Sequence, residues 1–274
     1  MQILRFDLRK EPTEHGFMPF LEVYRIDRFW EDCRRPMVVI CPGGGYEHVC
    51  ADREGERVAL QYNAAGYHAA VVHYAICPHR APEQLYELAE AFRIVRAHAE
   101  EWQLAPDKIA VCGFSAGGHL AASLSTLWDE PSLFSEEEIA SRVCRPDASI
   151  LCYPVITGGE KAHDGSFRAL LGTDDKSDPR RMLYSCESQV DPDTPPAFLW
   201  HTVEDTCVPV ENSILYASAL REHGVLFELH IFPRGCHGMS LVRDEYIWSK
   251  RMFERDYDWM VLSVDFLNEQ FGLV

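Results

Sequence analysis

The sequence predicts an α/β protein with a mostly parallel central sheet and helices on both faces. Short apolar runs alternate along the chain with longer segments whose apolar residues recur at helical spacing, which is typical of parallel strands joined by crossover helices. Most of the short runs are apolar throughout, which indicates strands buried on both faces. The composition agrees with this class, because 47% of the 274 residues are hydrophobic and 25% are charged.

The N-terminal part is expected to form one edge of this sheet. Residues 3–8 and 21–26 alternate apolar and polar side chains, which predicts half-buried antiparallel strands. Residues 37–41 (MVVIC) then predict a fully buried strand that runs directly into PGGGY at 42–46. A glycine triplet leaves backbone N–H groups uncovered, so this loop is either an oxyanion-binding loop or a plain flexible turn.

The alternation continues up to a segment around which the rest of the chain is organised. The apolar run at 109–112 leads into GFSAG at 113–117, and leucines at helical spacing follow it. Strand, Gly-x-Ser-x-Gly and helix is the context of a nucleophile elbow, in which a tight turn forces the serine into strained backbone angles. The turn would hold the Ser115 hydroxyl at the positive end of the new helix. A common small-residue turn is the alternative interpretation, but the flanking strand and helix favour catalysis.

The remaining elements complete one predicted domain over residues 1–274. Residues 157–196 hold no long periodic run and are dense in Gly, Asp, Ser and Pro, with short helical pieces around 167–171 and 179–184. We expect this insertion to lie over the strand ends as a cap that contacts the substrate. The other expected helices span 52–65, 83–102, 210–223 and about 256–270, with strands at 68–74, 148–155, 197–202 and 227–232 and a connection at 104–107.

Three polar residues follow core strands directly, namely Ser115, Asp205 and His237. The carboxyl ends of parallel strands gather at one rim of a sheet, so these side chains are expected to converge. A serine hydroxyl needs a base to accept its proton, and a carboxylate would hold the imidazole of that base in one tautomer. Glu204 is the rival of Asp205, although its side chain would point to the opposite side of an extended segment.

The sequence resembles an α/β-hydrolase esterase of the acetyl xylan esterase and hormone-sensitive-lipase-like group. The stretches that carry the resemblance are PGGGY at 42–46, GFSAGGHLA at 113–121, WHTVEDTCVPVENS at 200–213 and ELHIFPRGCHGMSL at 228–241. The order of serine, acid and histidine along the chain is the one expected of that fold. The resemblance covers the chain from about residue 35 to residue 237 and is weakest over 157–196.

The resemblance implies an oxyanion hole formed by the N–H groups of Gly44, Gly45 and Ala116. The N–H of Gly43 would substitute if the loop registers one residue earlier. The sequence departs from the lipase-like pattern at Pro42, where a histidine usually precedes the glycines and braces the loop. How the loop is held is therefore open at this point.

Four residues near these motifs are candidates to line the pocket. Tyr46 follows the glycine loop and is predicted as a substrate-binding residue, while Glu54 is a further candidate. For His119 and Trp200 we favour structural roles, with His119 packed on the elbow helix and Trp200 in the core.

The resemblance implies a serine carboxylesterase that cleaves short-chain acyl esters through an acyl-enzyme intermediate. By resemblance, the acyl group would be the acetyl of xylo-oligosaccharides, so the expected partner is a small ester or an acetylated oligosaccharide. A small serine peptidase of the prolyl-oligopeptidase type has the same fold and triad order and is the alternative function. A ligand-binding protein without catalysis is the interpretation from another class.

Charge and composition limit the other functions. The net charge of −17 argues against nucleic acid and anionic membranes as partners. No apolar run approaches the roughly 18 residues of a membrane span, and the N-terminus does not resemble a signal peptide. No Cys-x-x-Cys pair occurs, and we expect the cysteines to be core residues of a cytoplasmic protein. No metal-ligand spacing is present, so no metal and no cofactor are expected; a homo-oligomer stays open.

Overall fold

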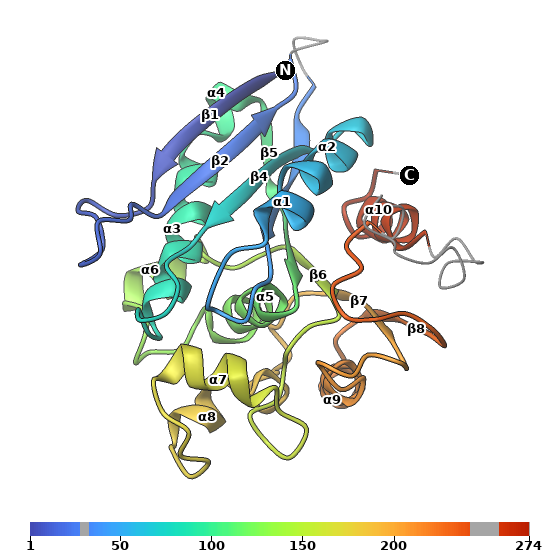
Figure 1. The fold of residues 1–274 in the computed structure, drawn as a ribbon. Helices are drawn as coiled ribbons and strands as arrows, with labels where there is room; N and C mark the ends of the chain where they lie inside the picture. The colour runs from blue at the N-terminus through green and yellow to red at the C-terminus, as the bar shows by residue number, and fades with distance from the viewer. Residues whose placement is uncertain (28–32, 242–257, 274) are drawn as a thin grey trace.

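The computed structural model describes residues 1–27, 33–241 and 258–273, and an eight-stranded sheet forms its centre (Figure 1). The strands are β1 (Gln2–Asp7), β2 (Phe20–Arg25), β3 (Arg35–Cys41), β4 (His68–His73), β5 (Leu104–Phe114), β6 (Ala148–Cys152), β7 (Ala197–Thr202) and β8 (Phe227–Phe232). Their order across the sheet is β1-β2-β4-β3-β5-β6-β7-β8. Neighbouring strands are parallel throughout the part of this order that runs from β4 to β8. Strands β1 and β2 form an antiparallel edge, because β1 pairs antiparallel with β2 and β2 pairs antiparallel with β4. The predicted mostly parallel sheet is confirmed.

Helices cover both faces of this sheet. They are α1 (Ala51–Glu54), α2 (Glu56–Ala64), α3 (Glu83–Ala97), α4 (Ala99–Trp102), α5 (Ala116–Leu127), α6 (Glu136–Ser141), α7 (Asp164–Leu171), α8 (Arg180–Leu183), α9 (Glu211–Glu222) and α10 (Trp259–Gln270), with a short 3₁₀ helix η1 (Cys186–Ser188). Figure 1 shows α2 and α10 on one side of the sheet, and α3 and α5 on the other.

Residues 37–41 of β3 show why this run is apolar at every position. Successive side chains of a strand point to opposite faces. Met37 and Val39 belong to the core cluster that contains residues of α3, α5 and α9. Val38 and Ile40 belong to the second cluster, with residues of α2 and α10. Because both faces are covered, an alternating pattern would place polar side chains in one of the two cores.

Some element boundaries differ from the sequence predictions. The helix expected over 52–65 is divided at Gly55, and the one expected over 83–102 is divided at His98. Residues 104–107, expected as a connection, begin β5, which pairs irregularly with β3 between Arg35 and Met37. The last helix begins at Trp259, and the two residues at the start of its expected range, 256 and 257, lie outside the described residues.

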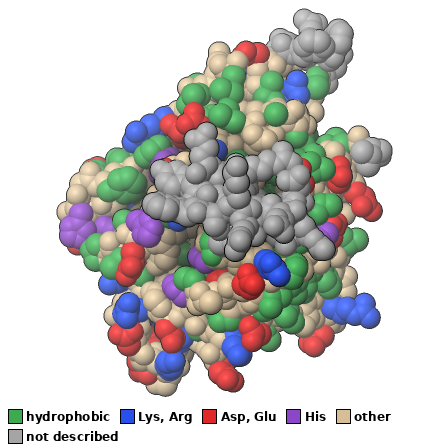
Figure 2. All heavy atoms as spheres, turned by 45° about the vertical axis from the view of Figure 1, so that its right-hand side comes forward, with side chains coloured by type: hydrophobic (Ala, Val, Ile, Leu, Met, Phe, Trp, Pro, Cys, Tyr) green, Lys and Arg blue, Asp and Glu red, His purple; other side chains and the backbone are tan. Residues whose placement is uncertain are grey.

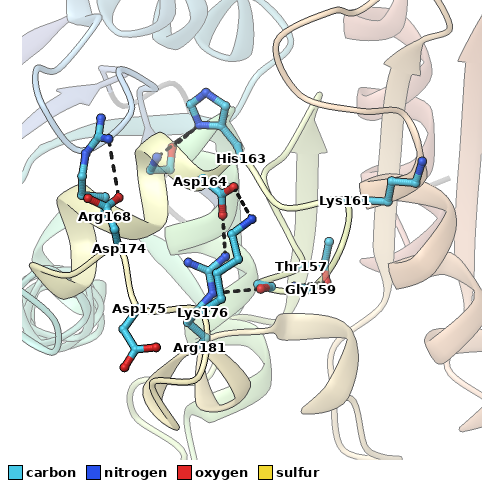
Figure 3. Close-up of polar contacts among 12 residues, drawn as sticks. Thr157, Gly159, Lys161, His163, Asp164, Arg168, Asp174, Asp175, Lys176 and Arg181 are labelled. Carbon is cyan, nitrogen blue, oxygen red and sulfur yellow. Dashed lines mark hydrogen bonds and ion pairs between the residues drawn. The ribbon is translucent and has the colours of Figure 1, made fainter.

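The insertion at 157–196 contains α7, α8 and η1 and packs against the rest of the chain. Phe167 and Leu170 of α7 are buried in the first core cluster. Polar contacts join its own parts, as Figure 3 shows: the Asp164 carboxylate lies 2.9 Å from Lys176 Nζ and 2.7 Å from Arg181 Nη2. Arg181 Nε also donates to the Gly158 carbonyl at 3.0 Å. These contacts fix α7 relative to α8.

Gly117 stands where the start of α5 passes against the end of β3, and it gives a prediction about stability. A Cβ at this position would lie 2.1 Å from the Cys41 carbonyl oxygen and 2.3 Å from that of Pro42. We expect Gly117→Ala to lower the free energy of unfolding by about 3 kcal/mol or more, because backbone must shift to admit the methyl group. Urea unfolding followed by circular dichroism measures this difference.

Gly159→Ala is the matched control. A Cβ at Gly159 would meet the side-chain oxygen of Thr157 at 3.1 Å, and no backbone atom lies among its near neighbours. We expect it to change the free energy of unfolding by about 1 kcal/mol or less. Equal stability of the two variants would contradict the close approach of α5 and β3.

Candidate active site

Ser115 lies at the turn between β5, which ends at Phe114, and α5, which begins at Ala116. Its backbone angles, φ 53° and ψ −119°, are sparsely populated by residues other than glycine. Three backbone hydrogen bonds hold it there: its N–H donates to the Cys152 carbonyl, and its own carbonyl accepts from the N–H groups of His119 and Val155, each at 3.0 Å. The strained elbow expected from GFSAG is therefore the observed local geometry.

The side chains of Ser115, His237 and Asp205 form one chain of hydrogen bonds. His237 Nε2 lies 2.7 Å from Ser115 Oγ, and His237 Nδ1 lies 2.6 Å from Asp205 Oδ2. The three residues come from the loops that follow β5, β8 and β7. The His237 side chain is 20% exposed, whereas Ser115 and Asp205 are buried, so the imidazole is the most exposed of the three groups. This is the arrangement that proton transfer from a serine hydroxyl to an imidazole requires.

Asp205 is held by more partners than His237. Its Oδ1 accepts hydrogen bonds from the N–H groups of Cys207 and Val208, both at 2.9 Å. His201 Nε2 lies 3.3 Å from Oδ2. Burial acts to raise the pKa of the Asp205 carboxyl, but the hydrogen bonds from His201, His237 and Val208 outweigh it and hold the pKa well below the usual range. The group is therefore a carboxylate at neutral pH.

Glu204, the rival acid in the sequence, makes a different contact. Its Oε2 accepts a hydrogen bond from the Gly235 N–H at 3.2 Å, and the residue is exposed. Its neighbour Asp205, and not Glu204, reaches the imidazole of His237.

The glycine loop at 42–46 lies between the end of β3 and α1. The Gly43 N–H donates to Glu54 Oε2 at 2.7 Å, and the Tyr74 hydroxyl donates to the Pro42 carbonyl at 2.6 Å. These two hydrogen bonds hold the loop in place, although proline stands where the lipase-like pattern has histidine. They also occupy the Gly43 N–H, the substitute donor in the alternative register.

Gly44 and Gly45 adopt backbone angles that favour glycine, with φ values of 128° and 65°. A Cβ at Gly44 would lie 2.1 Å from the His48 carbonyl oxygen. In the described part of the chain, the N–H groups of these two glycines donate to no backbone oxygen. The Ala116 N–H belongs to the first turn of α5, where no intrahelical acceptor exists.

The sequence profile of the BD-FAE family matches residues 30–220, more than half of the chain and including Ser115 and Asp205. The chain belongs to the BD-FAE family. Among solved structures, the acetyl ester-xyloside bifunctional hydrolase from Caldicellulosiruptor lactoaceticus is similar, with 38% identity, a TM-score of 0.83 and coverage of 99% of this chain and 97% of that one. The carboxylesterase Cest-2923 from Lactobacillus plantarum WCFS1 is similar at 27% identity, with a TM-score of 0.82 and coverage of 100% and 99%.

Curated relatives agree with this placement. Endo-1,4-beta-xylanase B of Butyrivibrio fibrisolvens is 38% identical over 86% of this chain, and acetylxylan esterase of Xylanibacter ruminicola is 36% identical over 74% of it. The chain spans less than half the length of each, 37% and 41% respectively. Together with the solved structures, these comparisons confirm the predicted α/β-hydrolase fold.

Tyr46, the last residue of the glycine loop of the BD-FAE protein, contacts His119 of α5. The Tyr46 side chain is buried, and its hydroxyl lies 2.8 Å from His119 Nδ1. His119 Nε2 lies 2.7 Å from the Tyr184 carbonyl, and burial lowers the pKa of His119 to about 4. The imidazole is therefore neutral and joins α5 to the insertion. The hydroxyl of Tyr46, predicted to bind substrate, is engaged in this packing.

Trp200 fills the core, as expected. It is fully buried, and its ring stacks on Trp259 of α10 with centroids 5.6 Å apart.

Two residues of the insertion lie beside the candidate site and were missed by the sequence analysis. His163 Nδ1 lies 2.8 Å from Ser166 Oγ, and His163 Nε2 lies 3.6 Å from Cys207 Sγ. A Cβ at Gly45 would lie 3.9 Å from Ser166 Oγ. The start of α7 therefore lies over the glycine loop. The insertion was predicted as a cap, but no local pattern distinguishes these two side chains within it.

A cavity with a volume of about 480 Å³ lies beside the glycine loop. Its lining includes Phe17, Ile76 and Tyr74, the residue that hydrogen-bonds the loop at Pro42. A volume of this order suits one small organic group.

Residues 1–27, 33–241 and 258–273 contain no group of three or more His, Cys, Asp or Glu side chains placed to hold a metal ion. No helix in these ranges has the length and apolar composition needed to cross a membrane.

Proposed function

We propose that this BD-FAE protein is a serine carboxylesterase that hydrolyses short-chain acyl esters, acetyl esters first among them. The observation that carries the proposal is the chain of hydrogen bonds from Ser115 through His237 to Asp205. This arrangement activates serine for acyl transfer: the hydroxyl is hydrogen-bonded to an imidazole, and the imidazole is hydrogen-bonded to a carboxylate.

The reaction has two steps on these residues. His237 Nε2 accepts the hydroxyl proton while Ser115 Oγ attacks the ester carbonyl, and the imidazolium then protonates the leaving alcohol. The Ala116 N–H and the N–H groups of Gly44 and Gly45 stabilise the oxyanion, aided by the positive end of α5. In the second step, His237 accepts a proton from water while the water oxygen attacks the acyl-enzyme carbonyl. The imidazolium then returns this proton to Ser115 Oγ as the bond between the acyl group and the serine breaks and the acid is released. Asp205 stays ionised and stabilises the imidazolium throughout.

The proposed substrates are small molecules with an acetylated sugar, such as xylo-oligosaccharides. Two relatives support this choice by their names, which are acetylxylan esterase and acetyl ester-xyloside bifunctional hydrolase. The charge distribution agrees, because acidic and basic side chains are interspersed on the face shown in Figure 2 rather than gathered in one patch. Such a surface suits a neutral glycan better than a polyanion.

A substrate screen tests the proposal. We expect hydrolysis of p-nitrophenyl acetate and of acetylated xylo-oligosaccharides, and a lower kcat/KM for p-nitrophenyl esters of longer acyl chains. Release of p-nitrophenol and of acetate measures the two activities. Cleavage of prolyl or aminoacyl amides without ester hydrolysis would instead support the peptidase alternative. A protein whose Ser115 is not labelled by a fluorophosphonate probe would be a binding protein and not a serine hydrolase.

A further inference from the structure

Glu54 is a buried carboxylate that the reaction steps above do not use. It lies at the end of α1, and its side chain is 2% exposed. Its Oε2 accepts a hydrogen bond from the Gly43 N–H at 2.7 Å, and its Oε1 accepts one from the Tyr153 hydroxyl at 2.8 Å. Both oxygens face donors, which is the pattern that matches the ionised carboxylate.

The contacts of Glu54 extend to the segment that carries His237. The Tyr153 hydroxyl accepts a hydrogen bond from the Ser240 N–H at 2.9 Å, and Ser240 is three residues after His237. The Tyr153 ring lies against the His237 imidazole edge to face, with centroids 5.1 Å apart. Ser240 Oγ donates to the Arg53 carbonyl, next to Glu54, at 2.5 Å. One carboxylate therefore connects the glycine loop and the histidine loop.

Glu54 is also close to the position of Ser115. A Cβ built on Gly43 would lie 2.9 Å from Glu54 Oε2 and 3.0 Å from Ser115 Cβ. The backbone of Gly43 is thus held between the carboxylate and the serine. A displacement of Glu54 would move this part of the loop relative to Ser115 Oγ.

Several charged groups act on Glu54 and on His237. Burial holds the pKa of Glu54 above its ordinary value, and the hydrogen bonds from Tyr153 and Gly43 and the positive charges of Arg53 and protonated His237 offset only part of that rise. Arg53 Nε lies 4.0 Å from Oε1. His237 is faced by the carboxylates of Asp205 and Glu54 and by the imidazole of His163. The geometry supports the ionised form, because both oxygens of Glu54 accept hydrogen bonds, and that carboxylate is a second negative charge acting on the imidazole of His237.

We propose that Glu54 is a positioning residue: it holds the glycine loop and the His237 loop in register around Ser115, and its carboxylate favours the protonated form of His237 during acyl transfer. This inference rests on the proposed esterase function. It assigns Glu54 no contact with the substrate.

The test is Glu54→Gln, which keeps the size of the side chain and removes its charge. The amide can accept from Gly43 or from Tyr153, but its NH₂ group then faces the other donor. We expect kcat for p-nitrophenyl acetate to fall roughly 10- to 100-fold with KM changed by less than about threefold, because misplacement of the reacting groups affects the transition state most. We also expect a change in the dependence of kcat/KM on pH. Its acidic limb, where activity falls as His237 becomes protonated, should move to lower pH by about half a unit or more, because loss of a nearby negative charge disfavours the imidazolium.

Tyr153→Phe separates position from charge. It removes the connection between Glu54 and Ser240 but leaves the carboxylate in place. We expect kcat to fall as in Glu54→Gln, with the acidic limb of the profile unmoved. If Glu54→Gln does not fold, Tyr153→Phe carries the test of positioning, and an unchanged kcat in that variant would overturn it.

Glu87→Gln is the matched control for a buried carboxylate. Glu87 is 1% exposed, and it accepts from the Ala75 N–H at 2.7 Å and from Arg9 Nε at 2.6 Å. We expect this variant to lower the unfolding temperature while the acidic limb stays where it is in the wild type. A shift of the limb in Glu87→Gln equal to that in Glu54→Gln would show that any buried charge has the effect, and would overturn the inference.

Labelling by a fluorophosphonate distinguishes a failure of this inference from a failure of the proposed function. If the wild type is not labelled at Ser115, the esterase proposal fails. If the wild type is labelled, and Glu54→Gln has the wild-type kcat and the wild-type acidic limb, only the role of Glu54 is overturned. A lowered kcat with an unmoved limb in Glu54→Gln would overturn the electrostatic part.

Discussion

Ser115→Ala is expected to lower kcat for p-nitrophenyl acetate by roughly a million-fold, to the level left by the remaining groups of the site. The hydroxyl whose oxygen lies 2.7 Å from His237 Nε2 is the proposed nucleophile, and no acyl-enzyme can form without it. The backbone bonds of residue 115 to Cys152 and Val155 do not involve its side chain, so the fold should persist. Steady-state hydrolysis measures the loss, and circular dichroism measures the fold.

Ser125→Ala is the control for this variant. Ser125 lies on the same helix, is fully buried and donates its hydroxyl to the Ala121 carbonyl at 2.9 Å. We expect its kcat to stay within a few fold of the wild type. Substantial hydrolysis by purified Ser115→Ala would contradict the assignment of the nucleophile.

Asp205→Asn is expected to lower kcat by about ten-thousand-fold, the second largest effect among the variants. The amide would present either an N–H to His237 Nδ1, which favours the tautomer with its proton on Nε2, or an oxygen without the full negative charge. Either change weakens Nε2 as the base for Ser115 and destabilises the imidazolium. Steady-state kinetics on the acetate ester measures the loss.

The same variant should alter the acid dependence of stability. The folded-state pKa of Asp205 is held below its usual value of about 3.9, so the ionised group contributes stability above that value and the contribution is lost as pH falls. We expect the unfolding temperature of Asp205→Asn to fall less than that of the wild type between about pH 5 and pH 2.

Glu204→Gln controls both measurements. Glu204 is exposed and contacts Gly235 rather than the imidazole, so we expect kcat within a few fold of the wild type. A ten-thousand-fold loss in this variant, with an active Asp205→Asn, would reverse the assignment of the acid.

Local pattern was enough for most of the sheet. The run MVVIC at 37–41 has apolar residues on both faces and lies within β3, while β7 and β8 have the bounds that were predicted for them. Chain order was enough for a hypothesis about Ser115, Asp205 and His237, because a parallel sheet brings its carboxyl ends to one rim. Their convergence was expected, and their catalytic role stays a prediction.

Other elements were missed although a signal was present. Helix α6 begins with a capping box, in which Ser135 accepts from the Glu138 N–H and Glu138 accepts from the Ser135 N–H, yet the sequence analysis did not predict it. Gly55 itself was a local signal that the helix is divided into α1 and α2. A Cβ there would lie 2.5 Å from the Ala51 carbonyl oxygen.

The sequence alone determined the fold class and the loops on which the candidate site residues lie, because hydrophobic period and glycine placement act over a few neighbouring residues. The tertiary structure decided which polar groups meet. Glu54 accepts hydrogen bonds from Gly43, 11 residues away, and from Tyr153, 99 residues away. No periodicity in the sequence relates such positions. A hydrogen bond depends on distances of a few tenths of an ångström, and only the packing of the two cores around the sheet sets those distances.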